Sequence, residues 1–430
     1  MAKRADINAC LQTLFGLRRF GIKLGLGAIR RMLSGLGNPH RRYKTIHIAG
    51  TNGKGSVASS LAAIFMRSGY RVGLYTSPHL VRFNERIQIN GEQITDEAII
   101  SLYRRVRRVM PGGREPTFFE FTTAMAFDAF AAAQVDWAII ETGMGGRMDA
   151  TNVITPELAI VTNISLEHRE YLGATIPQIA YEKAGIIKRR RPVVTGIRQP
   201  SAWAVLNEAA RSRSAPIYRL GRDFKFRRRG DGSFTYRGIR HSWSDMATGL
   251  AGDYQTINAA LVLAACELLI QKAPHLTRER IREGMLSTRW PGRLEIVSQK
   301  PLLMLDGAHN LDAAKQLARH LRAHFKDRSI TMVLGILDDK PYAAMLKLLA
   351  PLAGRVIATQ AQTGRALPAE KIADSVQALI DDVCIIRNVG DALTYAMQTA
   401  APESVILVAG SLYVVGEAKA ALEQKTVQPG

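Results

Sequence analysis

The 430-residue chain contains few cysteines, few acidic residues for its size and no long apolar run. Its three cysteines, Cys10, Cys266 and Cys384, are scattered, and no Cys/His pair has metal-ligand spacing. A disulfide framework and a zinc site are therefore excluded, and a reducing compartment is favoured. No run of about 18 apolar residues could span a bilayer, and the first residues lack the layout of a secretion signal. We expect a cytoplasmic protein without a membrane segment.

The shortage of acidic residues, 37 against 58 lysines and arginines, leaves a formal net charge of +21. Short basic runs at 188–191 and 227–229 raise the alternative of nucleic-acid binding. These runs contain no interleaved aromatic residues and belong to no recognisable nucleic-acid module, so we interpret them as solvated faces and expect no nucleic-acid partner. A basic cleft would also attract small anionic substrates, and charge alone does not decide between the two.

Chain length and an apolar content of 47% exceed what one hydrophobic core usually covers, which predicts two domains. The punctuating segment Trp290-Pro-Gly-Arg293 follows two helical patterns, and the strand rhythm restarts after it. We place the boundary there, with an ATP-binding domain at 1–290 and a smaller domain at 291–430.

The first domain is predicted to be α/β with a parallel-rich sheet. A β-branched run at 44–49, a glycine-rich turn, an apolar-periodic helix at 54–68 and a strand at 71–76 form a βαβ unit, which requires parallel strands. Alternating runs on either side of Gly-Asp-Gly predict a β-hairpin. The other elements expected in this domain are strands at 136–141, 158–163 and 192–195, hairpin strands at 224–229 and 233–236, and helices at 254–271 and 277–288.

The second domain is predicted to be a Rossmann-like α/β unit with a mostly parallel sheet. Ligands of such sheets bind beyond the carboxyl ends of the strands, so the loops after Asp306, Leu334 and Ala409 are candidate binding loops. Its expected strands lie at 302–306, 330–334, 355–359, 383–386 and 405–409.

A glycine-rich loop joins the first strand to the first predicted helix of the βαβ unit. At such a junction the backbone N–H groups and the helix dipole converge on a polyphosphate. Lys54 would neutralise the β- and γ-phosphates, and the hydroxyl of Ser56 would face Mg²⁺. The spacing departs from the standard P-loop, because Ile48 occupies the position of its first glycine and Gly55 separates lysine from serine. The candidate ATP-binding residues of this loop are Gly50, Thr51, Asn52, Gly53, Lys54, Gly55 and Ser56.

The shortened loop resembles that of ATP-dependent amide ligases, which include the peptidoglycan Mur ligases and the folate synthases. Further blocks occur in family order, one before the loop and the others after it: Phe20–Leu26, Thr76-Ser-Pro-His-Leu80, Glu85-Arg-Ile87, Phe119-Glu120, Glu141–Asn152, Glu182-Lys-Ala-Gly-Ile186, Pro291-Gly-Arg293 and Asp306-Gly-Ala-His-Asn310. Together they make the sequence similar to the folylpolyglutamate synthase and dihydrofolate synthase family of the Mur ligase superfamily, from about residue 20 to residue 416.

This resemblance implies an ATP-dependent ligase that adds L-glutamate to dihydropteroate, to the γ-carboxylate of a reduced folate, or to both. ATP would convert the carboxylate to an acyl phosphate, which the amine of glutamate then attacks. The implied cofactor is Mg²⁺, with K⁺ as a further candidate ion. A monomer is the default expectation for the assembly.

The resemblance also assigns roles to individual residues. Lys54, His168, Lys183 and Arg293 are the candidate catalytic residues, with Lys183 similar to a lysine that family members carry as a carbamate. The chain departs from the family at Glu167, where Asp is usual beside the histidine. The implied metal ligands are Ser56, Ser77, Glu120 and His168; Asn258, Arg293, Asp306 and His309 would contact the nucleotide; Asp149, Ala150 and Asn152 would bind the pterin substrate.

Several alternatives stay open from the residues alone. Arg293 is equally suited to an inter-domain salt bridge, and Asn258 to a hydrogen bond with the backbone of its helix. At the level of function, the rivals are a Mur-type amino-acid ligase and a nucleic-acid-binding P-loop NTPase. The Phe20–Leu26 segment and the Asp-Ala-Thr-Asn block disfavour the first, and the second domain disfavours the other.

Overall fold

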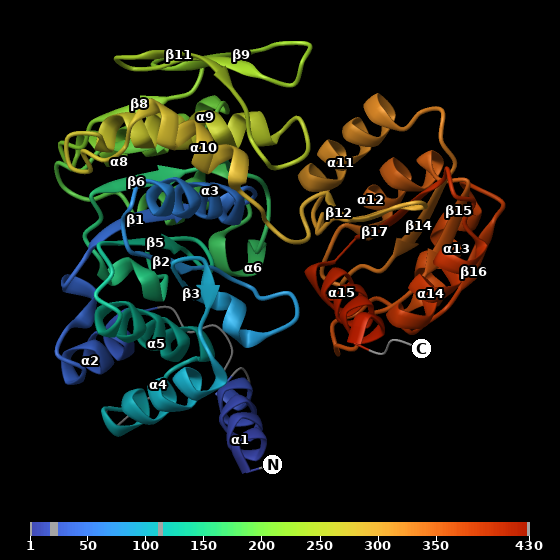
Figure 1. Ribbon diagram of the computed structural model, residues 1–430, viewed down its shortest axis with the longest axis horizontal. Helices are drawn as coiled ribbons and strands as arrows, with labels where there is room; N and C mark the ends of the chain where they lie inside the picture. The colour runs from blue at the N-terminus through green and yellow to red at the C-terminus, as the bar shows by residue number, and fades with distance from the viewer. Residues whose placement is uncertain (1, 18–24, 111–114, 428–430) are drawn as a thin grey trace. The chain divides into compact units, whose positions relative to one another are not determined.

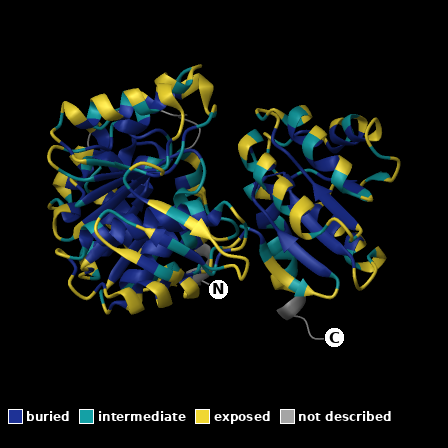
Figure 2. Ribbon diagram, turned by 90° about the horizontal axis from the view of Figure 1, so that it is seen from above, coloured by how far each residue is buried: buried dark blue, intermediate teal, exposed yellow. Residues whose placement is uncertain are grey.

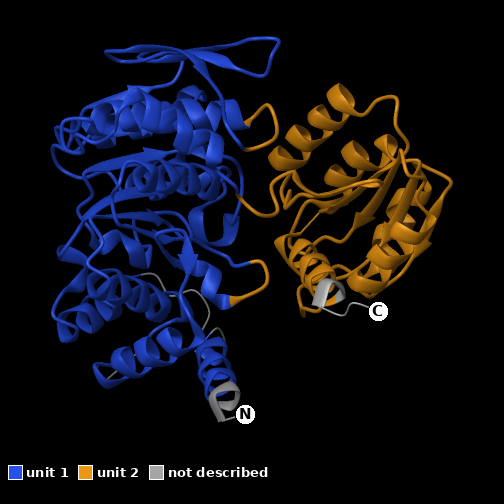
Figure 3. Cartoon of the chain, in the orientation of Figure 1, with its two compact units in different colours: residues 1–79, 83–249, 255–289 blue, residues 80–82, 250–254, 290–430 orange. Residues whose placement is uncertain are grey.

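The computed structural model describes residues 2–17, 25–110 and 115–427. The chain divides into two compact units, drawn in different colours in Figure 3. Unit 1 comprises residues 1–79, 83–249 and 255–289, and unit 2 comprises residues 80–82, 250–254 and 290–430. Most of the Phe20–Leu26 block falls on residues 18–24, which lie outside the described residues.

An eight-stranded sheet forms the centre of the described part of unit 1, in the order β4-β3-β2-β5-β1-β6-β7-β8 (Figure 1). The six strands from β2 to β8 in that order are parallel, while the β2–β3 and β3–β4 pairs are antiparallel. Its strands are β1 (Lys44–Ala49), β2 (Val72–Tyr75), β3 (Ile87–Ile89), β4 (Glu92–Gln93), β5 (Trp137–Glu141), β6 (Leu158–Val161), β7 (Val193–Thr195) and β8 (Ile217–Arg219).

Helices cover both faces of this sheet, and the strands between them are buried (Figure 2). The helices are α1 (Ala2–Gly16), α2 (Gly27–Gly35), α3 (Lys54–Arg67), α4 (Asp96–Arg108), α5 (Phe118–Ala132), α6 (Arg169–Leu172), α7 (Ile176–Ala184), α8 (Pro200–Arg211), α9 (Gln255–Leu269) and α10 (Arg278–Ser287), with short 3-10 turns η2 (Pro39–Arg41), η3 (Phe83–Arg86) and η4 (Ala150–Val153). α3 packs against α9 and α10. One apolar core joins α1, α2, α4 and α5 to the sheet, and another joins α7 and α8 to it.

A separate three-stranded antiparallel sheet, in the order β11-β10-β9, extends unit 1. Its strands are β9 (Lys225–Arg228), β10 (Phe234–Arg237) and β11 (Ser242–Met246). The carboxylate of Glu267 on α9 accepts hydrogen bonds from the Tyr236 hydroxyl at 2.9 Å and from the backbone N–H groups of Ile239, Arg240 and His241. One buried acid thereby fixes the β10–β11 turn to the body of the unit.

Unit 2 has a six-stranded sheet in the order β12-β13-β17-β14-β15-β16, in which only β12 is antiparallel among the described strands. Its elements are β12 (Glu295–Gln299), β13 (Leu302–Leu305), α11 (Leu311–His324), β14 (Ile330–Leu334), α12 (Tyr342–Leu349), η5 (Ala350–Leu352), β15 (Arg355–Ala358), α13 (Ala369–Gln377), β16 (Val383–Ile385), α14 (Val389–Thr399), β17 (Val405–Ala409) and α15 (Leu412–Val427). Alternate strand residues face two cores: α11, α12 and α13 cover one face, and α14 and α15 the other.

The α/β class of both units, the parallel-rich first sheet, and the β9–β10 hairpin are confirmed. The sequence did not predict the antiparallel strands β3, β4, β11 and β12. These strands are short or half-exposed. Pairing with a neighbouring strand defines each of them more than an apolar pattern of its own does. None of the described helices is both long enough and apolar enough to cross a bilayer.

Candidate active site

The loops that follow β1, β2, β5 and β6 meet at the carboxyl edge of the first sheet, as expected for neighbouring parallel strands. The loop after β1 is the glycine-rich segment 50–56, and α3 begins within it at Lys54. The first N–H groups of a helix have no intrahelical acceptor, so those of α3 are available to an anion. The predicted strand-loop-helix order is confirmed, and the binding of phosphate by this loop stays a prediction.

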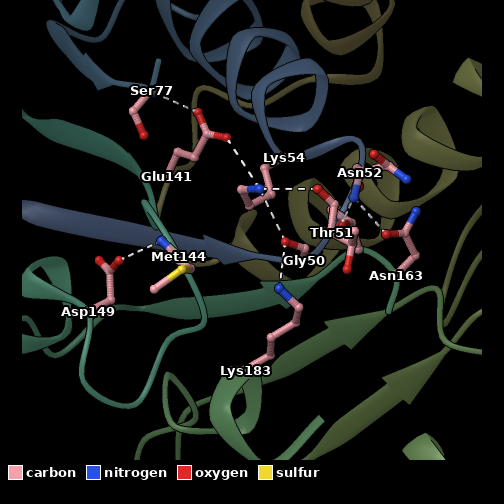
Figure 4. Close-up of polar contacts among 11 residues, drawn as sticks. Gly50, Thr51, Asn52, Lys54, Ser77, Glu141, Met144, Asp149, Asn163 and Lys183 are labelled. Carbon is pink, nitrogen blue, oxygen red and sulfur yellow. Dashed lines mark hydrogen bonds and ion pairs between the residues drawn. The ribbon is translucent and has the colours of Figure 1, made fainter. Parts of the chain in front are cut away.

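Two lysines from different elements converge on one carbonyl oxygen of this loop (Figure 4). Lys54 Nζ donates to the oxygen of Gly50 at 3.1 Å, and Lys183 Nζ, from α7, donates to the same oxygen at 2.8 Å. Lys54 Nζ also donates to the oxygen of Thr51 at 3.2 Å. The pKa of Lys183 falls to about 7, first because the amine is buried and second because Lys54 is nearby. Lys54 and the partly charged Lys183 therefore place positive charge beside the loop.

The strand next to β1 fixes the shape of this loop. Asn163, after β6, accepts from Thr51 N at its backbone oxygen and from Asn52 N at its side chain, at 3.0 and 2.8 Å. The hydroxyl of Thr162 donates to the oxygen of Asn52 at 2.7 Å. Because these bonds satisfy the early part of the loop, its backbone is held in place before any ligand binds.

Gly53 marks the point where the loop turns into α3. Its φ of 85° lies in the left-handed region, and a Cβ atom here would lie 2.6 Å from the side-chain oxygen of Asn258. The amide nitrogen of Asn258 donates to Gln255 Oε1 at 2.8 Å, and Gln255 Nε2 donates to the Ser56 hydroxyl at 3.2 Å. Asn258 therefore bonds another side chain of α9 and packs on the loop, which differs from the alternative of a backbone hydrogen bond.

Glu141, the last residue of β5, is a site residue to which the sequence assigned no role. Its Oε1 lies 3.9 Å from Lys54 Nζ, and its Oε2 accepts from Ser77 N at 3.1 Å (Figure 4). The register that pairs Ile48 with Glu141 puts this carboxylate beside the start of the loop. The sequence shows an acid at the end of a buried strand, and the register with β1 then places it beside the phosphate loop.

The four candidate metal ligands have different surroundings. Ser56 is buried and Ser77 is half-buried next to Glu141, but Glu120 caps α5 by accepting from Thr117 N and Oγ1 at 2.8 and 3.0 Å. His168 is exposed at the start of α6 with a φ of 51°. Their roles as metal ligands stay predictions.

The donor set near the loop suits Mg²⁺ bound together with a nucleotide. Among the described residues, no three His, Cys, Asp or Glu side chains are grouped closely enough to hold a metal by themselves. Mg²⁺ needs no such cage, because it keeps several waters and is held by one or two protein oxygens and by phosphates. The hydroxyl of Ser77, the carboxylate of Glu141 and the buried hydroxyl of Thr142, which has no hydrogen-bond partner, are oxygen ligands of the required hard type.

The loop after β5 contains the predicted pterin-binding residues, and its carboxylate is engaged within the loop. Asp149 accepts from Met144 N at 2.8 Å and from Thr151 N at 3.0 Å, and burial raises its pKa. Asn152 donates to the oxygens of Arg147 and Gly185, while its own buried oxygen has no partner. Ala150, between them, is buried. Asp149 thus shapes the loop, and the Asn152 oxygen is a polar group that a ligand could satisfy.

Three further candidates form a cluster of their own in unit 2. Asp306, directly after β13, accepts from Leu294 N at 2.9 Å and from Ala308 N at 3.0 Å. Burial raises the pKa of Asp306, and the nearby Arg293 opposes this rise. Arg293 packs on Gly307, whose oxygen contacts His309 Nδ1 at 2.8 Å. The structure therefore brings Arg293, Asp306 and His309 together within unit 2.

The comparisons with known proteins show the family of the chain. The Mur ligase middle domain matches residues 48–266, and the Mur ligase glutamate ligase domain matches residues 292–412. The dihydrofolate synthase/folylpolyglutamate synthase of Bacillus subtilis is 35% identical over 421 residues, which cover 95% of this chain and 97% of the relative. The chain belongs to the folylpolyglutamate synthase/dihydrofolate synthase family of Mur ligases.

Solved structures of this family share the fold over nearly the whole chain. Escherichia coli FolC in complex with DHPP and ADP has a TM-score of 0.88 at 30% identity and covers 97% of this chain and 98% of its own. The bifunctional enzyme of Yersinia pestis complexed with AMPPNP and a Mn ion has a TM-score of 0.86 at 31% identity, with coverages of 97% and 98%. The family resemblance drawn from the ordered motifs is thereby confirmed.

A substitution at Gly53 tests whether the contact of the loop with α9 matters for nucleotide binding. We expect Gly53→Ala to weaken ATP affinity by about tenfold or more, since the added Cβ must displace Asn258 in addition to straining the backbone. Gly69→Ala is a matched control, because Gly69 also has a positive φ but nothing within 4 Å of an added Cβ. It should cost only about 1–2 kcal/mol of stability and leave ATP affinity unchanged. Equal ATP affinities of the two variants in calorimetric titrations would contradict this role of Gly53.

Proposed function

We propose that the chain catalyses the ATP-dependent attachment of L-glutamate to dihydropteroate and to the γ-carboxylate of reduced folates. Family membership supports the reaction class, an acid–amino-acid ligase. The observation that carries the proposal is the convergence of Lys54 and Lys183 on the Gly50 carbonyl at the mouth of the phosphate loop. Such a positive centre suits a triphosphate and a carboxylate that must approach each other despite their like charges.

The chemistry requires the carboxylate to gain a leaving group before an amide can form at neutral pH. An oxygen of the carboxylate attacks the γ-phosphorus of ATP, which gives an acyl phosphate and ADP. The uncharged amine of glutamate then attacks the acyl carbon, inorganic phosphate leaves with the bonding electrons, and the amine loses a proton. Both steps depend mainly on position and on charge stabilisation.

Residues of the loop and of neighbouring elements would each contribute to these two steps. Backbone N–H groups at the start of α3 would bind the phosphates, and Lys54 would neutralise charge on the β- and γ-phosphoryl groups. Ser56, Ser77 and Glu141 offer oxygen atoms to a divalent ion. Bound Mg²⁺ would neutralise phosphate charge during transfer. In unit 2, the planar guanidinium of Arg293, which lies near Asp306 and Gly307, suits an anionic phosphoryl oxygen.

We also propose that Lys183 acts as a carbamate. Its pKa of about 7 leaves roughly half of the amine uncharged at neutral pH, against about one part in several thousand for an ordinary lysine. The uncharged amine can attack CO₂, which forms a carbamate and releases one proton. The product replaces a buried cation beside Lys54 with an anion, which relieves the repulsion between the two lysines and supplies an oxygen ligand for a metal.

The remaining parts of the proposal concern the substrates, a second ion, the assembly and the location of the protein. Glutamate and the two pterin substrates are the expected partners, and K⁺ is a candidate second ion. The pterin would bind at the loop of Asp149, Ala150 and Asn152. The expectations of a monomer and of a cytoplasmic location belong to this proposal as well.

Glutamate-dependent ADP release is the direct assay of the proposed reaction. With saturating ATP, Mg²⁺ and K⁺, we expect ADP release only when L-glutamate and either 7,8-dihydropteroate or tetrahydrofolate are present. Mass spectrometry should find each product heavier by one glutamyl unit, or by several with the folate. Absence of ADP release with both pterins would refute the proposal, and activity with only one would restrict it to a single glutamylation step.

The carbamate predicts a characteristic pH dependence. Because the pKa of Lys183 is lowered to about 7, the reactive uncharged amine accumulates as pH rises through about 7 and disappears below it. We expect a carbamate carbon signal from protein in ¹³C-bicarbonate that grows over this range and is absent in Lys183→Ala. Lys188, whose pKa is also lowered, to about 8, is a matched control, and Lys188→Gln should retain the signal. An active enzyme without this signal at pH 8 would contradict the carbamate.

A further inference from the structure

The three-stranded sheet β9–β11 of unit 1 has one apolar face and one basic face. Phe234 and Tyr236 of β10 and Trp243 of β11 are buried, and Tyr236 bonds Glu267 of α9. These residues form the inner face, which packs on the body of unit 1. The phosphate chemistry at the edge of the larger sheet uses none of these strands.

The strand register defines the outer face. In the β9–β10 pair, Lys225 lies directly opposite Arg237, and Arg227 lies opposite Thr235. Directly opposite residues of an antiparallel pair point to the same side, so these four side chains share one face. Lys225, Arg227 and Arg237 are all exposed. We call these four residues the basic face.

The positive charges of the basic face are not balanced by acids. Arg229, at the end of the same strand, forms an ion pair with Asp245. In the described structure, by contrast, Lys225, Arg227 and Arg237 have no ion pair with a carboxylate. Like charges placed directly opposite each other destabilise a sheet. Folding alone therefore gives no reason for the Lys225–Arg237 pair, and an anionic ligand would.

A groove of about 510 Å³ runs over this part of the hairpin. Four arginines and two small residues line it: Arg227, Arg228, Arg229, Gly230, Thr235 and Arg237. Guanidinium groups bind carboxylates and phosphates through paired N–H donors. Arg229 is already paired with Asp245, and the register puts Arg228 on the same face as Phe234, so Arg227 and Arg237 are the guanidinium groups that the basic face offers to an anionic ligand. In Figure 1, β9 and β11 lie at the margin of unit 1, where a long ligand has access.

The spacing of the charges distinguishes between anionic polymers. Lys225 and Arg227 are two residues apart on one face of a strand, which separates them by about 7 Å. A γ-linked glutamyl unit has five backbone bonds against three in an ordinary residue, so an extended γ-glutamyl chain repeats about every 6 Å. The basic face has no aromatic side chain on which a nucleic-acid base could stack. Evenly spaced carboxylates fit this face better than nucleotides do.

We propose that the basic face of the β9–β10 hairpin binds the poly-γ-glutamyl tail of folates. Lys225 and Arg237, which lie opposite each other, would pair with one α-carboxylate, and Arg227 would pair with the next. The inference rests on the proposed function, because a ligase that extends such tails meets them as substrate and product. The site lies wholly within unit 1 and is distinct from the phosphate loop. It would retain long-tailed folates near the enzyme between rounds of addition.

Binding of pteroylpentaglutamate and pteroylmonoglutamate to the whole protein, measured by calorimetry without ATP, tests this site. We expect the pentaglutamate to bind about tenfold more tightly than the monoglutamate, with an advantage that falls as salt is raised. Arg227→Ala/Arg237→Ala should abolish this advantage. The matched control Arg319→Ala/Arg322→Ala removes the same charge from exposed positions of α11 and should keep it.

Each other outcome overturns the assignment. Equal affinity for the two ligands, or equal loss of the advantage in both double variants, would show that the hairpin makes no specific contact with the tail. Tighter binding of a single-stranded RNA oligonucleotide than of the pentaglutamate would assign the face to nucleic acid instead. Ligation of glutamate to tetrahydrofolate is assayed in the same variants and should be unchanged, so failure of the tail site and failure of the proposed reaction are separately visible.

Discussion

The approach of two lysine ammonium groups to the single carbonyl oxygen of Gly50 is the interaction on which the rest of the site depends. Lys54 and Lys183 lie 3.1 and 2.8 Å from this oxygen, and Lys183 is buried. Two lysine amines bonded to one oxygen lie close together, and their charged forms repel each other where water is excluded. Burial first, and the nearby Lys54 second, lower the pKa of Lys183 to about 7. Negative charge, from phosphates or from a carbamate, would offset the repulsion between the lysines, so the arrangement is suited to bind anions.

The parallel sheet is what makes this arrangement attainable. β1 carries the loop, β6 provides Thr162 and Asn163 that bond it, β5 ends in Glu141, and α7 delivers Lys183. These residues are far apart in the chain, but parallel strands release their carboxyl ends at one edge. The elements that surround the edge are buried apolar strands and helices, so the charged groups are positioned by a rigid scaffold.

Local pattern was enough to predict most of this scaffold. The βαβ unit, the phosphate loop and the parallel strands of unit 2 follow from apolar periodicity and glycine placement, because these signals are contained within a few residues. The strands β11 and β12 were not predicted, because pairing with a neighbouring strand, more than an apolar pattern of their own, defines each of them.

The family resemblance pointed to Lys183, Arg293 and Asp306 as site residues, and the structure added which groups these residues contact. Glu141 was visible only as part of a motif, since its partner Lys54 is 87 positions earlier and the strand register alone brings them together. The local hydrogen bonds of Glu120 and Asp149 were not predicted, although Thr117 three residues before Glu120 forms a capping-box pattern with it.

Ligation turnover of Lys54→Met with tetrahydrofolate, glutamate and saturating MgATP tests the central claim most directly. Methionine keeps the length and apolar stem of the side chain but removes the charge that the account assigns to the triphosphate. Turnover should fall by about 10²–10³-fold, with an unchanged unfolding transition, whereas Lys315→Met on the exposed face of α11 should retain full activity. A folded Lys54→Met protein with full turnover would contradict the account.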